Sequence, residues 1–295
     1  MSSRPEERTV MERAGMVGVV DVVVPCFNDG AYLIEALSSL GSGRGKGEGV
    51  FIVNDGSTDA HTLDVLAGLR MRGFRVIDQE NRGLSAARNT GWRACTAPCV
   101  LFLDADNKVD PALLGRTTAV MDREPSVAVV YSDKLEFGGR DGIVEQPEVT
   151  LGHLLIGNSI DACAVVRREV LEALGGYDER MRDGYEDWEL WIRAMAAGHG
   201  FRRIPEPLFS YRVREGSLVS RASRPDIRAS IVAYVARKHE ALFVQHAHTV
   251  VTELHRIQAH DRLLVLGAEK VASEAKASAA QALNAAREAG DALVV

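Results

Sequence analysis

The stretch Cys99–Asn107 constrains the fold more than any other part of the chain. Its first five residues are apolar and predict a strand buried on both faces, as in parallel sheets. The strand ends on Asp104-Ala105-Asp106. Ligands of open α/β sheets bind outside the carboxyl ends of the strands. Two carboxylates one residue apart therefore predict a ligand site at this end, and a divalent cation that carries a diphosphate is the natural candidate.

Three earlier apolar runs predict further strands, at Val19–Val24, Val50–Val53 and Phe74–Ile77. Segments with helical spacing of apolar residues separate them, and each of the first two strands is followed by turn-forming residues. Strands that alternate with helices at this pace indicate βαβ units. The sequence therefore predicts an α/β fold with a mostly parallel sheet flanked by helices.

Composition and charge narrow the class of protein. The chain has 295 residues, of which 46% are hydrophobic and 26% charged, with a net charge of −6. These values are typical of a soluble globular protein and argue against general attraction to nucleic acid. The cysteines form no Cys-x-x-Cys pair, which favours buried reduced thiols over a zinc site. No stretch is long enough to span a bilayer. We expect a cytoplasmic protein that can also act at the inner membrane face.

The later part of the chain has less regular patterns. We predict strands at Val127–Tyr131 and Ile160–Val166, a variable loop at Glu136–Leu151, and two short strands around Phe201–Ile204 and Leu208–Tyr211. Three regions follow from these patterns: a leader at 1–18, a domain at 19–222 and a helical extension at 223–295.

The extension is rich in helix-forming residues, and its Ala-rich part, 268–289, has few large apolar side chains. Such a helix buries little surface alone, so it either pairs with another helix or frays. A partial heptad through Leu254, Ile257 and Leu264 is interrupted by Asp261. A homodimer through these helices is one of the alternatives.

Taken in order, several segments of the chain resemble the family 2 glycosyltransferases, which are nucleotide-sugar-dependent enzymes of the Rossmann-like GT-A fold. The first half contributes Val22-Val23-Val24-Pro25-Cys26-Phe27-Asn28, Val53-Asn54-Asp55-Gly56-Ser57-Thr58-Asp59, Asn81-Arg82-Gly83-Leu84-Ser85-Ala86-Ala87-Arg88-Asn89 and Leu103-Asp104-Ala105-Asp106. The second half contributes Gly175-Gly176-Tyr177-Asp178-Glu179, Glu186-Asp187-Trp188-Glu189-Leu190-Trp191-Ile192-Arg193 and Tyr211-Arg212. Each segment is common, whereas the ordered series is specific.

The resemblance implies a donor site for a nucleotide-diphospho sugar, with UDP or dTDP as the expected nucleotide. Asp55 would accept a hydrogen bond from the pyrimidine ring, as suits an acceptor-only side chain facing a ring N–H. Pro25, Phe27 and Asn28 would line the donor pocket. Asp104 would contact the ribose.

The resemblance also implies that Asp106 ligates Mn²⁺ or Mg²⁺, which would act as a Lewis acid for the departing diphosphate. Arg88 is expected either to contact phosphate or to tether Asp104. Family members often have a metal-binding histidine soon after the Tyr-Arg dipeptide, whereas this chain has Arg214. An arginine cannot ligate a cation but can pair with the diphosphate, so we expect weaker metal binding through Asp106, phosphate and water.

The family's position for the general base corresponds to Asp187. Its neighbour Glu186 would not share this role, because successive side chains on a helix diverge by about 100°. A single base opposite the leaving group implies one in-line displacement with inversion. Gly176, Glu186 and Trp188 would lie on the acceptor side, although the apolar stripe of Trp188 favours core packing for that residue. The acceptor would be a sugar, a lipid-linked sugar or another small molecule, as in the biosynthesis of polysaccharides and glycoconjugates.

Two other functions remain open at this point. A nucleotide-sugar-binding protein without catalysis, whose helical tail is an interaction module, would need no intact set of acidic site residues. A sugar-phosphate nucleotidylyltransferase of related fold would need a Gly-rich first loop with a basic residue directly after the first strand. The chain has Pro25-Cys26-Phe27-Asn28 there instead.

Overall fold

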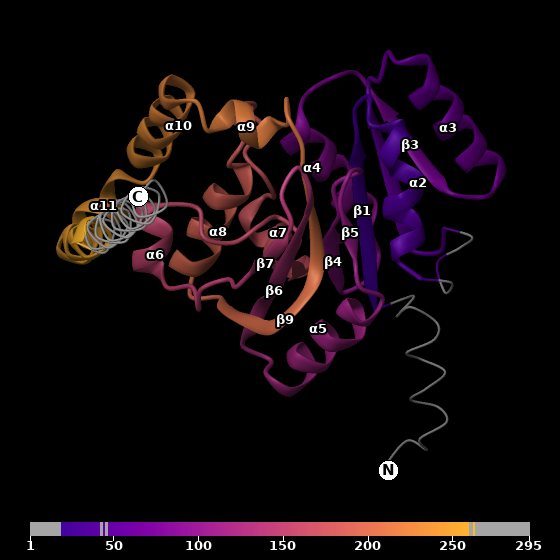
Figure 1. Ribbon diagram of the computed structural model, residues 1–295. Coiled ribbons are helices and arrows are strands. Elements are labelled where there is room, and N and C mark those ends of the chain that lie inside the picture. Colours follow the sequence, from indigo (N-terminus) through magenta and orange to yellow (C-terminus); the bar gives the residue numbers. More distant parts are fainter. Residues whose placement is uncertain (1–18, 42–43, 45–46, 260–261, 263–295) are drawn as a thin grey trace, which may run out of the picture. The chain divides into compact units, whose positions relative to one another are not determined.

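A computed structural model describes residues 19–41, 44, 47–259 and 262 (Figure 1). The chain divides into two compact units, 1–244 and 245–295. The predicted leader at 1–18, the Ala-rich segment 268–289 and Leu264 of the partial heptad lie outside the described residues. The predicted boundary at 222/223 stays a prediction.

The first four strands form a parallel block in the order β3-β2-β1-β4. They are β1 (Val20–Cys26), β2 (Val50–Asp55), β3 (Arg75–Gln79) and β4 (Cys99–Phe102). Every residue of β1, β2 and β4 is buried, as expected of strands covered by helices on both faces. The predicted βαβ pattern of this half is confirmed.

The second half continues the same sheet in the order β4-β8-β6-β9-β5, and β7 pairs with β6. These strands are β5 (Lys108–Val109), β6 (Val127–Gly138), β7 (Gly142–Val144), β8 (Val165–Arg167) and β9 (Gly200–Val213). Antiparallel pairing enters at β8, β7 and β5, whereas β6 and β9 are parallel to each other. The sheet is therefore mostly parallel in strand direction, as predicted.

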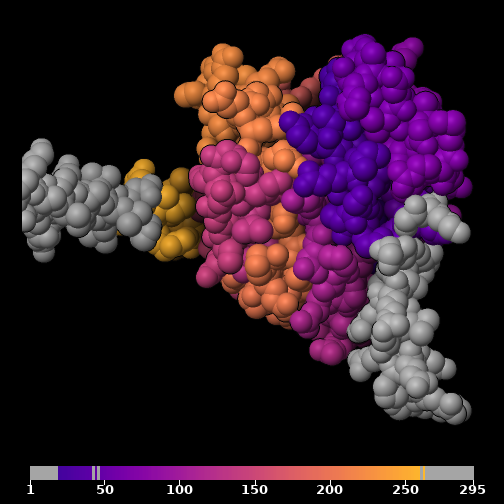
Figure 2. Space-filling model, turned by 45° about the vertical axis from the view of Figure 1, so that its right-hand side comes forward, coloured from indigo at the N-terminus to yellow at the C-terminus, as the bar shows by residue number. Residues whose placement is uncertain are grey.

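Helices cover both faces of this sheet (Figure 1). α4 packs on β1 and β2, α5 packs on β6 and β9, and α8 packs on α6 and α7. In the larger unit, the orange segments late in the chain come to the surface among the magenta segments of its middle (Figure 2). The helices are α2 (Gly30–Ser39), α3 (Ala60–Met71), α4 (Leu84–Ala94), α5 (Ala112–Arg123), α6 (Leu151–Ile156), α7 (Arg168–Leu174), α8 (Glu186–Ala196), α9 (Leu218–Ala222), α10 (Pro225–Lys238) and α11 (Glu240–Gln245).

Local signals set several helix ends. The Asp59 side chain accepts a hydrogen bond from the Thr62 amide and caps α3. Gly175, at φ +76°, adopts the left-handed conformation that ends α7. Both ends coincide with residue types that favour these positions.

Three expectations for the second half are wrong. Glu136–Leu151 is not a loop throughout, because β6 continues to Gly138 and pairs with β7. β6 thus runs past the predicted strand at Val127–Tyr131, and Asp133 in its middle is buried and paired with Arg203 of β9 at 2.6 Å. The predicted strand at Ile160–Val166 is confined to Val165–Arg167. The two predicted strands at 201–211 form the single strand β9, which is irregular opposite Ser132/Lys134.

In the second unit, residues 247–259 are helical. Its Val251, Leu254 and Ile257 side chains are exposed. The homodimer stays a prediction. Among the described residues, no helix combines the length and the apolar character that a membrane span requires.

Candidate active site

Arg88 of α4 joins two acidic segments that are far apart in the sequence. It is 1% exposed. Its Nη2 donates to Asp104 Oδ1 at 2.7 Å, directly after β4, and its Nη1 donates to Glu186 at the start of α8. Burial acts to lower the pKa of Arg88, but the charges of Asp104 and Glu186 hold it well above its ordinary value. Arg88 therefore tethers Asp104, and both of its terminal nitrogens are occupied.

A second arginine lies between two carboxylates at the same edge of the sheet. Arg214, just after β9, donates from Nε to Asp106 Oδ2 at 2.7 Å and from Nη2 to Asp29 Oδ1 at 2.8 Å. Its guanidinium lies 5.2 Å from the centre of the Tyr32 ring. Burial and the charge of Asp104 raise the pKa of Asp106 to about 6. Negative charge is thus concentrated around Asp29, Asp104 and Asp106.

This acidic cluster can supply only some of the ligands that a divalent cation needs. Among the described residues, no group of three His, Cys, Asp or Glu side chains is arranged to hold a metal ion. Mg²⁺, however, is often held by one or two carboxylates, with substrate phosphates and water completing its shell. Within the described chain, Asp106 Oδ1 accepts no hydrogen bond. Asp106 therefore fits a single-carboxylate site that a diphosphate would complete.

Asp55 closes a turn at the end of β2. Its Oδ1 accepts from Gln79 Nε2 at 2.6 Å and from the Arg82 amide at 2.9 Å, and its Oδ2 accepts from the Gly83 amide at 2.8 Å. A carboxylate has about four acceptor positions. One position therefore remains for a further donor group, such as a ring N–H.

The residues at the end of β1 differ from one another in exposure and in their contacts. Pro25 is buried within the strand, whereas Phe27 is 45% exposed at its end. Asn28 adopts φ +57°, and its Oδ1 accepts from the Thr58 and Asp59 amides at 2.8 and 2.9 Å. Asn28 therefore joins the loops after β1 and β2, and Phe27 presents an open aromatic surface beside them.

Asp187 lies in the first turn of α8, next to Glu186. The helix begins after Tyr185, whose left-handed φ of +59° turns the chain into it. Burial and the Glu186 charge raise the pKa of Asp187. Its Oδ1 accepts from Asn158 Nδ2 at 3.0 Å and from the Trp188 amide at 2.8 Å. Its Oδ2 makes no hydrogen bond to any described residue. This is a buried carboxylate with one unoccupied oxygen.

Asn158 and Asp161 also belong to this cluster, although no motif points to either. They lie in the irregular segment between α6 and β8. Burial is the largest cause of the raised pKa of Asp161, and the nearby Asp104 charge adds to it. The Asp161 charge in turn helps to raise the pKa of Asp187. Asn158 precedes the predicted strand at Ile160–Val166 and Asp161 falls inside it, and single polar residues at such places are too common to identify a site.

The three residues expected on the acceptor side are all buried and engaged within the protein. Glu186 pairs with Arg88, and the Trp188 indole donates to the Leu154 carbonyl. Gly176 has φ +78°, and a Cβ there would lie 2.3 Å from Asn89 Oδ1. These contacts are structural, and an acceptor contact by any of the three stays a prediction.

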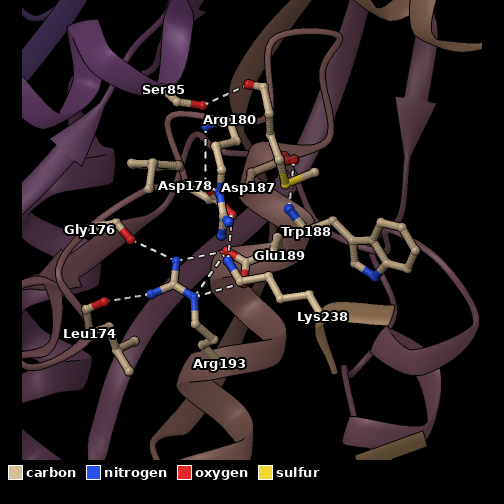
Figure 3. Close-up of polar contacts among 12 residues, drawn as sticks. Ser85, Leu174, Gly176, Asp178, Arg180, Asp187, Trp188, Glu189, Arg193 and Lys238 are labelled. Carbon is tan, nitrogen blue, oxygen red and sulfur yellow. Dashed lines mark hydrogen bonds and ion pairs between the residues drawn. The ribbon is translucent and has the colours of Figure 1, made fainter. Parts of the chain in front are cut away.

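A separate charge network anchors α8 one turn further on (Figure 3). Arg193 donates to the carbonyls of Leu174 and Gly176, each at 2.7 Å, and pairs with Glu189 at 2.8 Å. Lys238 of α10 contacts Glu189 at 2.7 Å. The segment before α8, the helix itself and α10 are thereby joined, which fixes the helix that carries Asp187.

The amino-acid sequence matches models of two known protein families. The model of Glycosyl transferase family 2 matches residues 21–175, just over half of the chain, and that of Glycosyltransferase like family 2 matches residues 144–253. The chain belongs to glycosyl transferase family 2. The family 2 resemblance, and with it the prediction of a glycosyltransferase enzyme, is confirmed.

Curated relatives of this family 2 chain carry related descriptions. It is 30% identical over 247 residues to the O-antigen biosynthesis protein RfbC of Myxococcus xanthus, covering 82% of this chain and 19% of that protein. It is 30% identical over 220 residues to the uncharacterized glycosyltransferase Rv0539 of Mycobacterium tuberculosis, covering 72% and 94%. The chain thus spans about a fifth of RfbC and nearly all of Rv0539.

Solved structures share the fold of this family 2 chain. Staphylococcus aureus TarS 1–349 in complex with UDP-GlcNAc has a TM-score of 0.59 at 22% identity, covering 74% of this chain and 66% of that one. The mannosyltransferase PcManGT of Pyrobaculum calidifontis, in complex with GDP-Man and Mn²⁺, has a TM-score of 0.52 at 21% identity, covering 68% and 59%. At these identities the likeness establishes the GT-A fold, as predicted.

Proposed function

We propose that this protein is an inverting glycosyltransferase that moves a sugar from a UDP- or dTDP-linked donor to an acceptor hydroxyl. The observation that carries the proposal is the bridge from Asp104 through Arg88 to Glu186, because it links the strand end expected to bind the donor with the first turn of α8. Asp187 follows Glu186 directly and keeps one oxygen without a partner among the described residues.

The proposed reaction is a single displacement. The acceptor oxygen forms a bond to the anomeric carbon while the bond from that carbon to the diphosphate oxygen breaks, and the nucleoside diphosphate leaves with that electron pair. Asp187 Oδ2 takes the proton of the acceptor hydroxyl. A base works best when its pKa is near the working pH, and the raised pKa of Asp187 suits this task.

On the donor side, Asp55 would accept from the pyrimidine ring and Phe27 would stack on it. Asp104, oriented by Arg88, would contact the ribose, and Arg214 would pair with the diphosphate. Asp106 would hold Mn²⁺ or Mg²⁺, which supplies Lewis-acid stabilisation of the leaving diphosphate.

The decisive experiment replaces the proposed base. We expect Asp187→Asn to lower kcat by about 10²- to 10⁴-fold, because general bases typically contribute that much. Donor affinity should not change. Transfer is measured as nucleoside diphosphate release from UDP-glucose, UDP-N-acetylglucosamine, dTDP-glucose or GDP-mannose, with p-nitrophenyl hexosides as acceptors, and donor affinity by calorimetry.

Asp183→Asn is the matched control, because Asp183 is a half-exposed aspartate just before the same helix and pairs only with Arg221 among the described residues. This variant should keep full activity. An equal loss of donor affinity in Asp187→Asn would show a structural role for Asp187. If the wild type binds donor but releases no nucleoside diphosphate with any acceptor, the protein is a nucleotide-sugar-binding protein.

Metal removal tests Asp106 separately. We expect EDTA to lower transfer and to weaken nucleoside diphosphate binding, with Mn²⁺ restoring both. The effect on binding should be modest, because Arg214 beside Asp106 also offers the diphosphate a positive charge. Transfer and binding that EDTA leaves unchanged would show that the metal role of Asp106 is wrong.

A further inference from the structure

Asn158 is the side chain that holds the proposed base. It follows α6 in the irregular segment before β8. Its Nδ2 donates to Asp187 Oδ1 at 3.0 Å, and the same oxygen accepts from the Trp188 amide at 2.8 Å. With Oδ1 doubly engaged, the carboxylate cannot rotate freely, and Oδ2 is left as the oxygen available to a ligand.

The oxygen of the Asn158 side-chain amide, unlike its nitrogen, is left unpaired within the described chain. Asn158 Oδ1 is buried and has no hydrogen-bond partner among the described residues. A buried acceptor without a donor is costly, so such an atom calls for an explanation. With Asp187 ionised, the opposite orientation of the amide would place its oxygen against a carboxylate oxygen, with no donor between them. A hydroxyl group entering the site next to Asp187 would satisfy the amide oxygen.

The charges around Asp187 explain why this one hydrogen bond matters. Glu186 on α8 and Asp161 in the segment after α6 both oppose ionisation of Asp187, and Arg88 of α4 favours it. The buried phenol of Tyr177 also interacts electrostatically with Asp187. Among the described side chains, Asn158 is the one that donates a hydrogen bond to Asp187. It stabilises the ionised form, which is the form that accepts a proton.

We propose that Asn158 is the positioning residue for Asp187 and part of the acceptor subsite. Its Nδ2 holds Oδ1 so that Oδ2 meets the reacting hydroxyl, and its amide oxygen accepts from a second hydroxyl of the acceptor. The subsite therefore favours acceptors with neighbouring hydroxyls, such as sugars, over simple alcohols. This inference rests on the proposed function for its chemistry and on the contacts of Asn158 for its geometry.

The first test follows the titration of Asp187 directly and requires no transfer. Protein labelled with ¹³C at aspartate carboxyls is titrated by NMR, and the Asp187 resonance is assigned by its absence in Asp187→Asn. We expect Asn158→Ala to raise the midpoint by about one unit, because the ionised form loses its hydrogen bond. Asn158→Asp, nearly identical in shape, should raise it as well by adding a negative charge. Ser159→Ala, in the same segment, should leave it unchanged.

The second test uses the p-nitrophenyl hexoside on which the wild type acts. Asn158→Ala should lower kcat about tenfold or more, move the acidic limb of the pH profile to higher pH and raise the acceptor KM. Asn158→Asp keeps an oxygen at the amide position, so its acceptor KM should rise less. Donor affinity should be equal in all variants.

The outcomes separate this inference from the proposed function. An unchanged Asp187 midpoint in both Asn158 variants overturns the inference, whatever the activity. Full loss of transfer in Asp187→Asn together with wild-type kinetics in Asn158→Ala also overturns it, while the proposed function stands. A raised midpoint in a protein that transfers no sugar supports the Asn158 contact and rejects the proposed function.

Discussion

Helix α8 carries three buried carboxylates, and the pKa values of two of them, Asp187 and Glu189, are shifted in opposite directions. Asp187 is 8% exposed and Glu189 is 0% exposed. Burial and Glu186 raise the pKa of Asp187. Burial also acts to raise the pKa of Glu189, but hydrogen bonds from His239, Arg193 and Lys238 outweigh it and lower that pKa to about 2.

The difference shows that partners, rather than burial, decide what a buried carboxylate can do. Glu189 is surrounded by cationic groups from α8 and α10, so its charge is fully used in holding the helix (Figure 3). Asp187 has a neutral amide and a backbone N–H as partners and lies beside a second carboxylate. The first group is therefore a permanent anion, and the second can exchange a proton.

The largest expected effect on stability is that of replacing Glu189, and it should differ sharply from that of replacing Asp187. Glu189→Gln removes the anion at the centre of several cations and should lower the free energy of unfolding by about 3–5 kcal/mol. Asp187→Asn removes a poorly compensated charge and should lower it little or raise it. Urea unfolding at pH 7 measures both. Similar losses in the two variants would show that both carboxylates are structural.

The change in the free energy of unfolding with pH should be nearly as large as the effect of Glu189→Gln. Folding lowers the pKa of Glu189 from 4.5 to about 2, so its contribution of about 3 kcal/mol is present above pH 4.5 and is lost as the pH falls towards 2. Asp187 has the opposite sign, because its folded pKa is raised and its ionisation costs stability as the pH rises. Urea unfolding across this range should show a shallower acid loss in Glu189→Gln, whereas an unaltered slope would contradict the assignment.

The smallest expected effect lies at the edge of the Glu189 network. The Tyr234 hydroxyl donates to Asp178 Oδ2 at 2.6 Å, and Lys238 contacts the same oxygen at 2.6 Å. Tyr234→Phe removes one of several donors, so it should cost about 1 kcal/mol without changing kcat. Thermal unfolding and the transfer assay measure the two quantities. A fall in kcat larger than the fall in stability would mean that α10 reaches the reaction centre through this contact.

The first half of the fold was predictable because its signals are local. Apolar runs place β1 to β4 within a few residues of their observed ends, and the helically spaced segments between them form the helices. Patterns of this kind cannot account for β6, where Asp133 is buried because Arg203 arrives from β9. They also divided β9 in two, because its proline-containing irregular part carries no strand pattern of its own.

Most residues of the candidate site could be named from the sequence, but the contacts between them could be predicted only in part. Asp55, Asp104, Asp106 and Asp187 were chosen from a resemblance, and their roles stay predictions. Asn28, Gly176 and Trp188 prove to be engaged in loop joining and packing. Asn158 and Asp161 were missed, since a single polar residue in an irregular segment has no periodic signal.

By itself, the sequence determined the alternation of strands and helices, the acidic ends of the strands and the family, because each of these is encoded by residues close together along the chain. Only the tertiary structure decided which carboxylate is neutralised and which is left reactive. Arg88 reaches Glu186 across 98 positions and Asn158 reaches Asp187 across 29. The pKa of a buried acid depends on such neighbours, and no local pattern records them.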